Sequence, residues 1–122
     1  MIRGVRGATT VEKNNANDII KATEKLLLEM IESNKIIPTD VASVMISVTE
    51  DLTASFPAKA LRNIDGWMYV PVMCMQEITV PNALSHCIRV MMTINTSLEQ
   101  EEVNHVYLEK ATALRPDLFD RK

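Results

Sequence analysis

The longest segment with helical spacing of apolar residues runs from 18 to 33. Its leucines, isoleucines and methionine form a wide stripe, and most of its lysines and glutamates lie outside that stripe. Asn15 or Asn17 can cap the start of a helix, and Pro38 prevents the helix from continuing. The pattern predicts one long amphipathic helix with a broad apolar face.

Alternating apolar and polar residues predict strands in most of the remaining chain. Pro71 interrupts one of these segments, which demotes it to an edge or bulged strand. Pro57 suits the first position of a short helix. We expect strands at 2–11, 41–49, 67–75, 86–95 and 105–111, a short helix at 57–63 and a turn of helix at 97–101.

This order of elements predicts an α/β or α+β fold: a mixed sheet of about five strands with one long and one short helix on one face. The 122 residues fit one domain, 1–122, with a mobile tail expected at 117–122. Gly4 and Gly7 in the first strand indicate a close approach of the backbone to another segment. Because one long helix covers only part of the sheet, the other apolar face needs a cover, and self-association is the simplest source.

An arginine interrupts the most apolar predicted strand. Taking its charge out of water is costly without a partner, so Arg89 suggests a lined pocket, where its rigid fork of donors suits an anion. The pattern equally fits an arginine that pairs with a buried glutamate or reaches the surface by its stem. Met91 and Met92 are interpreted as packing residues. Alternation assigns His86, Ile88, Val90, Met92 and Ile94 to a core face and Cys87, Arg89, Met91 and Thr93 to the opposite face.

Three further polar residues stand in or beside apolar segments: Arg6, Glu77 and Tyr107. If the strands share a sheet, these side chains can converge with Arg89 at one edge. The arginines would bind a carboxylate or phosphate, Glu77 would accept a hydroxyl hydrogen, and Tyr107 would add a donor. Such a pocket suits a small, polyanionic, hydroxylated molecule. Glu77 follows directly after a strand, so it also fits a solvated loop residue.

Composition and charge argue against several classes of protein. A net charge of −3 disfavours nucleic acid as the main partner, and no apolar run approaches the ~18 residues that span a bilayer. The first residues lack the apolar core of a signal peptide, so we expect a cytoplasmic protein with reduced thiols at Cys74 and Cys87. His86 and Cys87 would point to opposite faces, and we expect no metal site.

A series of short motifs follows in order along nearly the whole chain: Arg3-Gly4-Val5-Arg6-Gly7-Ala8-Thr9-Thr10, Phe56-Pro57-Ala58-Lys59-Ala60-Leu61-Arg62, Gly66-Trp67, Tyr69-Val70-Pro71-Val72, Cys74-Met75-Gln76-Glu77, Cys87-Ile88-Arg89-Val90, His105-Val106-Tyr107-Leu108-Glu109 and Leu114-Arg115-Pro116-Asp117-Leu118. Each motif alone is moderately specific. Together they strongly resemble the monofunctional chorismate mutases of the Bacillus type (AroH class).

The resemblance implies an isomerase that converts chorismate to prephenate, on the route to phenylalanine and tyrosine, without a cofactor. It also implies a homotrimer whose sheets pack into a central pseudo α/β barrel, with active sites between adjacent subunits. Chorismate would be the small-molecule partner, with no nucleic acid and no membrane. The reaction is a unimolecular Claisen rearrangement, so the enzyme must hold the compact conformer and stabilise charge that develops as the C–O bond breaks.

The same resemblance assigns roles, with Arg89, Glu77 and Arg6 as the catalytic residues. Arg89 would donate to the ether oxygen and to a carboxylate. Arg6 and Tyr107 would bind the carboxylate of the enolpyruvyl arm, and Glu77, with the main chain at Cys74, would hold the ring hydroxyl. The other expected substrate-binding residues are Phe56, Ala58, Lys59, Arg62, Val72, Met73, Met75, Gln76, Leu114 and Arg115.

Two residues differ from those expected in the family, and one pair of site residues does not fit a regular strand. Met73 and Asn82 stand where smaller residues, Thr and Gly, are expected in relatives, so the pocket wall and a loop would differ. Cys74 and Glu77 are three residues apart, which puts their side chains on opposite faces of a regular strand. Either a bulge intervenes, or Cys74 contributes backbone atoms.

Two other functions stay open from the residues. An imine or enamine deaminase of similar trimeric architecture also grips a carboxylate with an arginine, but it needs a water-activating group. A non-catalytic module that senses an aromatic acid would bind such a ligand without turnover. Loss of chorismate in the presence of purified protein separates these three functions.

Overall fold

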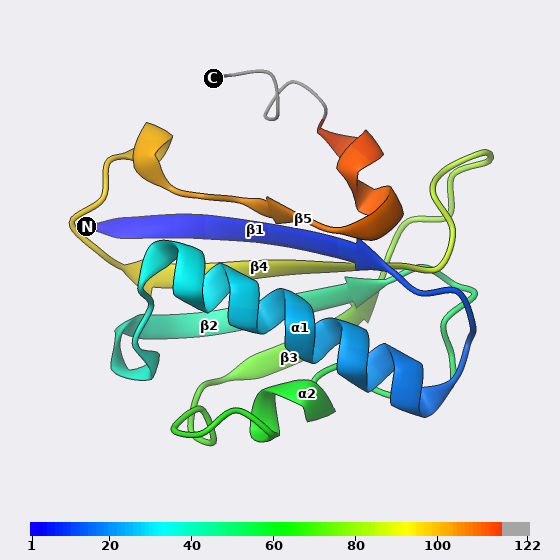
Figure 1. Ribbon diagram of the computed structural model, residues 1–122, viewed down its shortest axis with the longest axis horizontal. Helices are drawn as coiled ribbons and strands as arrows, with labels where there is room; N and C mark the ends of the chain where they lie inside the picture. The colour runs from blue at the N-terminus through cyan, green and yellow to red at the C-terminus, as the bar shows by residue number, and fades with distance from the viewer. Residues whose placement is uncertain (116–122) are drawn as a thin grey trace.

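Five strands form one mixed sheet: β1 (Ile2–Thr10), β2 (Val41–Val48), β3 (Val72–Gln76), β4 (Cys87–Asn95) and β5 (Val106–Tyr107). They lie in the order β3-β2-β4-β1-β5 (Figure 1). Strand β4 pairs antiparallel with β1 and β2, and the outer strands β3 and β5 pair parallel with their neighbours. The computed structural model describes residues 1–115, so the tail expected at 117–122 lies outside the described residues.

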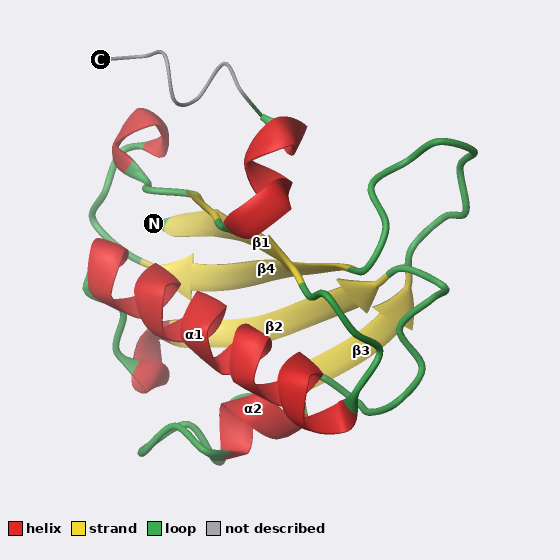
Figure 2. Ribbon diagram, turned by 45° about the vertical axis from the view of Figure 1, so that its right-hand side comes forward, coloured by secondary structure: helices red, strands yellow, loops and turns green. Residues whose placement is uncertain are grey.

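Two helices, α1 (Ala16–Asn34) and α2 (Lys59–Arg62), cover one face of this sheet (Figure 2). Asn15 caps α1: its side-chain oxygen accepts hydrogen bonds from the backbone N–H groups of Asn17 at 2.9 Å and Asp18 at 3.2 Å. The predicted fold class, a mixed sheet with one long and one short helix on one face, is confirmed. Short 3-10 helices occur at η1 (Pro38–Asp40), η2 (Gln100–Glu102) and η3 (Glu109–Leu114).

The main core lies between the helices and the sheet. Alternate residues of the central strands point into it, and Val5 and Met92 are fully buried there. Gly7 lets α1 approach β1: a Cβ atom on Gly7 would overlap the Met30 Sδ atom and lie 3.1 Å from Leu26 Cδ1. The close approach predicted at this glycine is therefore present.

The third predicted strand is shorter than expected, because only its second half pairs in the sheet. Residues 67–70 form turns instead, and Trp67 and Val70 are buried. Pro71 has no N–H to donate, and its carbonyl accepts from the Val44 N–H at 2.9 Å where the β2–β3 ladder starts. The edge position predicted for this strand is confirmed.

Two predictions near the later strands are wrong. His86 does not belong to the core face of β4, because its backbone is left-handed, with φ of 49°, and its side chain is 33% exposed. Strand β5 does not continue to Ala111. Glu109, with φ of 52°, turns the chain into η3, and the apolar side of η3 packs against Ala8 and Tyr107.

We predict that Gly7→Ala lowers the free energy of unfolding by about 1–3 kcal/mol, because the added methyl group overpacks the contact with α1. Met30 is fully buried, so its thioether has no open space to enter. Urea unfolding followed by circular dichroism measures the change. Gly4→Ala is the control, because its methyl group would meet only Met91 Sδ, at 3.2 Å. Equal effects of the two substitutions would contradict the argument.

Candidate active site

The face of the sheet opposite the helices carries the charged strand residues. Arg89 of β4 lies between Ala8 of β1 and Ser47 of β2 in the pairing register, and these small neighbours leave room for its long side chain. Arg6 projects on the same side, two residues before Ala8. This surface is named the open face, and its residues include Arg6, Ala8, Met45, Ser47, Arg89 and Met91.

A cavity of about 360 Å³ lies on the open face. Both arginines line it, β5 contributes the buried Tyr107, and the end of the chain's described part contributes Leu114 and Arg115. Three guanidinium groups make the lining cationic, which suits a small ligand with more than one anionic group. The remaining lining residues are Gly7, Ala8, Met45, Ser47, Met75, Val90 and Met91.

Glu77 lies beside Arg89 on the open face. Its backbone N–H donates to the Val48 carbonyl at 2.8 Å, just past the end of β3. Its carboxylate accepts a hydrogen bond from Ser47 Oγ at 2.9 Å and forms an ion pair with Arg89 Nε at 3.5 Å. The side chains of Arg89 and Glu77 are 50% and 29% exposed. Arg89 therefore has a glutamate partner, although a partly exposed one and not the buried glutamate considered as an alternative, and Arg89 still lines the cavity.

Cys74 and Glu77 point to opposite sides of the sheet, as a regular strand requires. The β2–β3 register continues without a shift from Val72 to Gln76, and Cys74 packs against the core on the helix side. The bulge considered as one explanation is therefore wrong. A contact between the main chain at Cys74 and a ligand stays a prediction.

A second cavity, of about 590 Å³, lies at the β3 edge of the sheet and is named the edge cavity. Five of the predicted site residues line it: Phe56, Lys59, Cys74, Met75 and Gln76. Met75 also lines the open-face cavity. Five others, Ala58, Arg62, Val72, Met73 and Glu77, line neither of the two cavities. A single chain therefore does not bring the predicted site residues together in one cavity.

Among the lining residues that the sequence analysis missed are Met45, Ser47 and Met91. The interpretation of Met91 as a packing residue is wrong, whereas Met92 is fully buried as expected. Alternation along the second strand could have placed Met45 and Ser47 opposite the core. It could not reveal that Ser47 binds Glu77, which is 30 residues away.

The two positions at which smaller residues were expected have different consequences. Met73 is 66% exposed and does not narrow the open-face cavity. Asn82 has a left-handed backbone, with φ of 67°. Glycine adopts this conformation most easily and asparagine tolerates it better than most residues, so Asn82 fits a loop in which Gly was expected.

Cys87 is buried two residues before Arg89. Burial raises the pKa of the Cys87 thiol, and the opposing charge of Arg89 does not reverse this shift. The thiol is therefore protonated at neutral pH and is not an activated nucleophile. Within residues 1–115, no three His, Cys, Asp or Glu side chains are grouped so that they could hold a metal ion.

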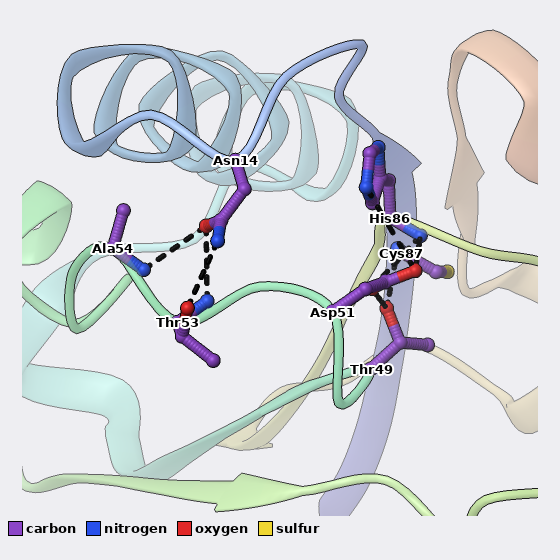
Figure 3. Close-up of polar contacts among 7 residues, drawn as sticks. All are labelled: Asn14, Thr49, Asp51, Thr53, Ala54, His86 and Cys87. Carbon is purple, nitrogen blue, oxygen red and sulfur yellow. Dashed lines mark hydrogen bonds and ion pairs between the residues drawn. The ribbon is translucent and has the colours of Figure 1, made fainter.

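A carboxylate fixes the chain where it enters β4 (Figure 3). Asp51 accepts hydrogen bonds from the His86 N–H, at 3.1 and 3.0 Å, and from Thr49 Oγ1, at 2.5 Å. Thr49 Oγ1 in turn accepts from the Cys87 N–H at 3.0 Å. Partial burial acts to raise the pKa of Asp51, but the hydrogen bonds and the His86 charge together outweigh it and hold this pKa below its ordinary value. This anchor determines where β4 begins.

A second anchor in Figure 3 holds the loop that leads to the edge cavity. Asn14 Oδ1 accepts hydrogen bonds from the N–H groups of Thr53 at 2.9 Å and Ala54 at 3.0 Å. Asn14 Nδ2 donates to Thr53 Oγ1 at 2.9 Å. The segment before α1 therefore positions the loop that carries Phe56 and leads into α2 with Lys59.

The fold and the cavities define a class of protein: a small α+β protein whose open face suits a compact polyanion. Residues 2–118 match the family described as chorismate mutase type I. The chain is 54% identical over 118 residues to chorismate mutase AroH of Bacillus subtilis (strain 168), which covers 97% of this chain and 93% of the relative. It is 48% identical over 119 residues to chorismate mutase AroH of Thermus thermophilus, covering 97% of each chain.

A solved structure agrees with these sequence matches. The chorismate mutase from Clostridium thermocellum superposes with a TM-score of 0.87 at 48% identity, covering 90% of this chain and 97% of that chain. The chain therefore belongs to the type I chorismate mutase family and is an isomerase of that family. The predicted resemblance is confirmed, and the deaminase and the sensing module give way to it. No helix within the described residues is long and apolar enough to cross a membrane.

We predict that Asp51→Asn lowers the free energy of unfolding at pH 7 by about 1 kcal/mol, a value that allows for solvent screening. The amide puts an N–H donor against the donors of Thr49 and His86. Because the folded pKa of Asp51 is depressed, its contribution is present above the unfolded value of about 3.9 and is lost as the pH falls through the lower folded value.

Urea unfolding at pH 7 and at about pH 3 measures this difference. The gap between wild type and Asp51→Asn should narrow at the lower pH. Glu50→Gln is the neighbouring control, since the Glu50 carboxylate accepts an exposed hydrogen bond from Thr79 Oγ1 at 3.3 Å. A gap that is equally wide at both pH values would show that the Asp51 charge does not contribute.

Proposed function

We propose that this chain converts chorismate to prephenate with the open-face cavity as the charged half of its active site. The observation that carries the proposal is the contact of Glu77 with Arg89 and Ser47. Arg89 and Ser47 line the open-face cavity together with Arg6 and Tyr107. Chorismate has two carboxylates, a hydroxyl and an ether oxygen. The cavity offers cationic donors for the carboxylates and the ether oxygen, and Glu77, which pairs with Arg89, offers an acceptor for the hydroxyl.

Positioning is the first task of these residues, because bonds reorganise within a single molecule without a nucleophile or general base. Arg6 and Tyr107 bind the carboxylate of the enolpyruvyl arm. They come from adjacent strands, β1 and β5, whose register pairs Ala8 with Tyr107. With the ring hydroxyl bound by Glu77, both ends of the substrate are held and the compact conformer is favoured.

Stabilising charge is the second task, and it belongs to Arg89. The ether oxygen becomes negative only as the C–O bond breaks, so a donor fixed beside it favours the transition state over the bound substrate. Glu77 engages Arg89 through Nε, at 3.5 Å. The two terminal nitrogens of the guanidinium are then the ones that meet the ether oxygen and a carboxylate. Ser47 holds Glu77 in place, so the ion pair is supported from β2.

The second half of the site comes from another copy of the chain in this proposal, within a homotrimer that packs its sheets around a central pseudo-barrel. Two observations support it. Exposed methionines stand on the open face, with Met45, Met73 and Met75 43%, 66% and 40% exposed. Ten of the fifteen predicted site residues also line the open-face cavity or the edge cavity, and of these Met75 alone lines both. Apposing one cavity to the other across an interface brings Lys59 toward Arg89 and covers the methionines.

The setting of the reaction is also part of the proposal. Chorismate and prephenate stand on the route to phenylalanine and tyrosine, and we place the enzyme in the cytoplasm. Cys74 and Cys87 are both free thiols, which fits a reducing compartment.

We predict that Arg89→Ala lowers kcat by at least ~10²–10³, the usual cost of deleting one preorganised donor. Arg89→Lys should also be strongly impaired, because it keeps the charge and loses the fork. The loss of chorismate absorbance with purified protein measures both rates. Arg3→Lys is the control, since Arg3 pairs with Glu99 at 3.5 Å and lies outside the open-face cavity. Wild-type turnover by Arg89→Lys would remove Arg89 from the proposed role.

We further predict that two impaired variants restore activity to each other when subunits are exchanged. Arg89→Ala damages the open-face cavity, and Lys59→Glu reverses the charge that Lys59 places in the edge cavity. If each site joins these two cavities from neighbouring subunits, random mixing leaves about a quarter of the sites with both halves intact. Mixing without exchange is the control. Exchange that restores no activity, with trimers present by light scattering, would contradict sites shared between subunits.

A further inference from the structure

The edge strand β5 is fastened to β1 by a side chain as well as by its backbone. The ladder pairs Gly7 with Val106 and Ala8 with Tyr107, and it ends there. Just before this ladder, the N–H of Arg6 in β1 donates a hydrogen bond at 3.0 Å to Nδ1 of His105, the residue that precedes β5. The imidazole thus takes the place of a backbone acceptor. It extends the contact between β1 and the β5 segment to Arg6, one of the proposed substrate-binding residues.

This hydrogen bond specifies the protonation state of the ring. A backbone N–H can only donate, so Nδ1 of His105 must offer its lone pair, and the proton of the neutral ring is on Nε2. An imidazolium has N–H groups on both nitrogens. Protonation would therefore set an N–H of the ring against the N–H of Arg6 and break the contact.

The surroundings of the ring include two arginines among the described residues. His105 lines a recess of about 300 Å³ whose charged lining groups, among the described residues, are Arg3 and Arg6. Arg3 forms an ion pair with Glu99 of the η2 region and donates to the Leu98 carbonyl at 3.1 Å. Arg6 also lines the open-face cavity, so it forms the wall between the two spaces.

On the helix side, uncharged groups hold the neighbouring residue in place. Asn34 of α1 donates to the Asn104 carbonyl at 2.8 Å and accepts from the Asn104 N–H at 2.8 Å. Asn104 Nδ2 donates to the Ser33 carbonyl at 3.0 Å. The backbone just before His105 is therefore fixed to α1, and the ring is held at a constant position beside β1.

We propose that His105 is a positioning residue: its neutral ring holds Arg6 and the Tyr107 strand together, and its protonation releases them. This inference rests on the proposed function, because Arg6 and Tyr107 bind the same carboxylate there. The ring itself touches no reacting atom in this proposal. It acts by keeping two donors on adjacent strands at a fixed separation, so its loss should appear chiefly in KM.

The test compares two substitutions at pH 7.5 and at about pH 5.5, on either side of the usual imidazole titration. Asn carries its Oδ1 where His carries Nδ1, so His105→Asn keeps an acceptor that does not titrate. We expect it to retain KM near the wild-type value at both pH values. His105→Ala should raise KM about tenfold at pH 7.5, the cost of one lost positioning contact. The wild type should show a rise in KM at the lower pH that His105→Asn lacks.

His86→Asn is the matched control, because His86 is the other histidine of the chain and its left-handed backbone suits Asn. It should keep the pH dependence of the wild type. A wild-type KM for His105→Ala at both pH values would overturn the proposal. So would a pH dependence that survives in His105→Asn.

Nitrogen-15 NMR of the imidazole rings gives a readout that does not depend on turnover. The neutral His105 ring should show the tautomer with the proton on Nε2, and the Arg6 amide signal should shift as the ring titrates. The opposite tautomer would overturn the proposal even if the enzyme is active. Absence of chorismate turnover with the expected tautomer would instead count against the proposed function. The spectrum of the wild type decides even if His105→Ala does not fold.

Discussion

The register of β4 between β1 and β2 is the constraint on which the rest of this structure depends. It sets Arg89 between Ala8 and Ser47, two residues small enough to leave space for a guanidinium. A slip of one residue would turn Arg89 toward α1 and Val90 toward the open face. The helix side is filled by fully buried side chains such as Met92, so a charge there would have neither water nor a partner. Packing of the core therefore determines that Arg89 lies on the open face.

The anchor at the start of β4 shows how this register is maintained at one end. Asp51 binds the backbone of His86, and Thr49 binds the backbone of Cys87, so the strand is held by side chains from the end of β2 and the loop that follows it. The left-handed backbone of His86 ends the extended conformation at that point. Glu77 closes the arrangement from the other side, because its N–H is bound to β2 and its carboxylate to Arg89. The anchor at the start of β4 and the contacts of Glu77 thus both involve β2 and β4.

Local patterns in the sequence predicted the parts of this arrangement that depend on period. The alternation in β4 correctly assigned Arg89 and Val90 to opposite faces, and the spacing of Cys74 and Glu77 correctly separated their side chains. Features that depend on distant partners were missed or wrong. His86 leaves the strand because Asp51, 35 residues away, binds its N–H, and Ser47 gains its role only from Glu77. The division of the site residues between two cavities follows from tertiary structure, which no local pattern contains.

The open face carries both charged and exposed apolar side chains. Its centre carries Arg6 and Arg89, which line the open-face cavity, while Met45 and Met75 at 43% and 40% exposure are too apolar to remain in water at low cost. The helices α1 and α2 pack against the other face, so they do not cover these methionines. In the proposed trimer, a neighbouring subunit covers them and also brings a second cavity to the arginines. In this proposal, assembly excludes water from the guanidinium groups of the open-face cavity. Electrostatic stabilisation of a developing charge is stronger in a water-excluded cavity than on an exposed sheet.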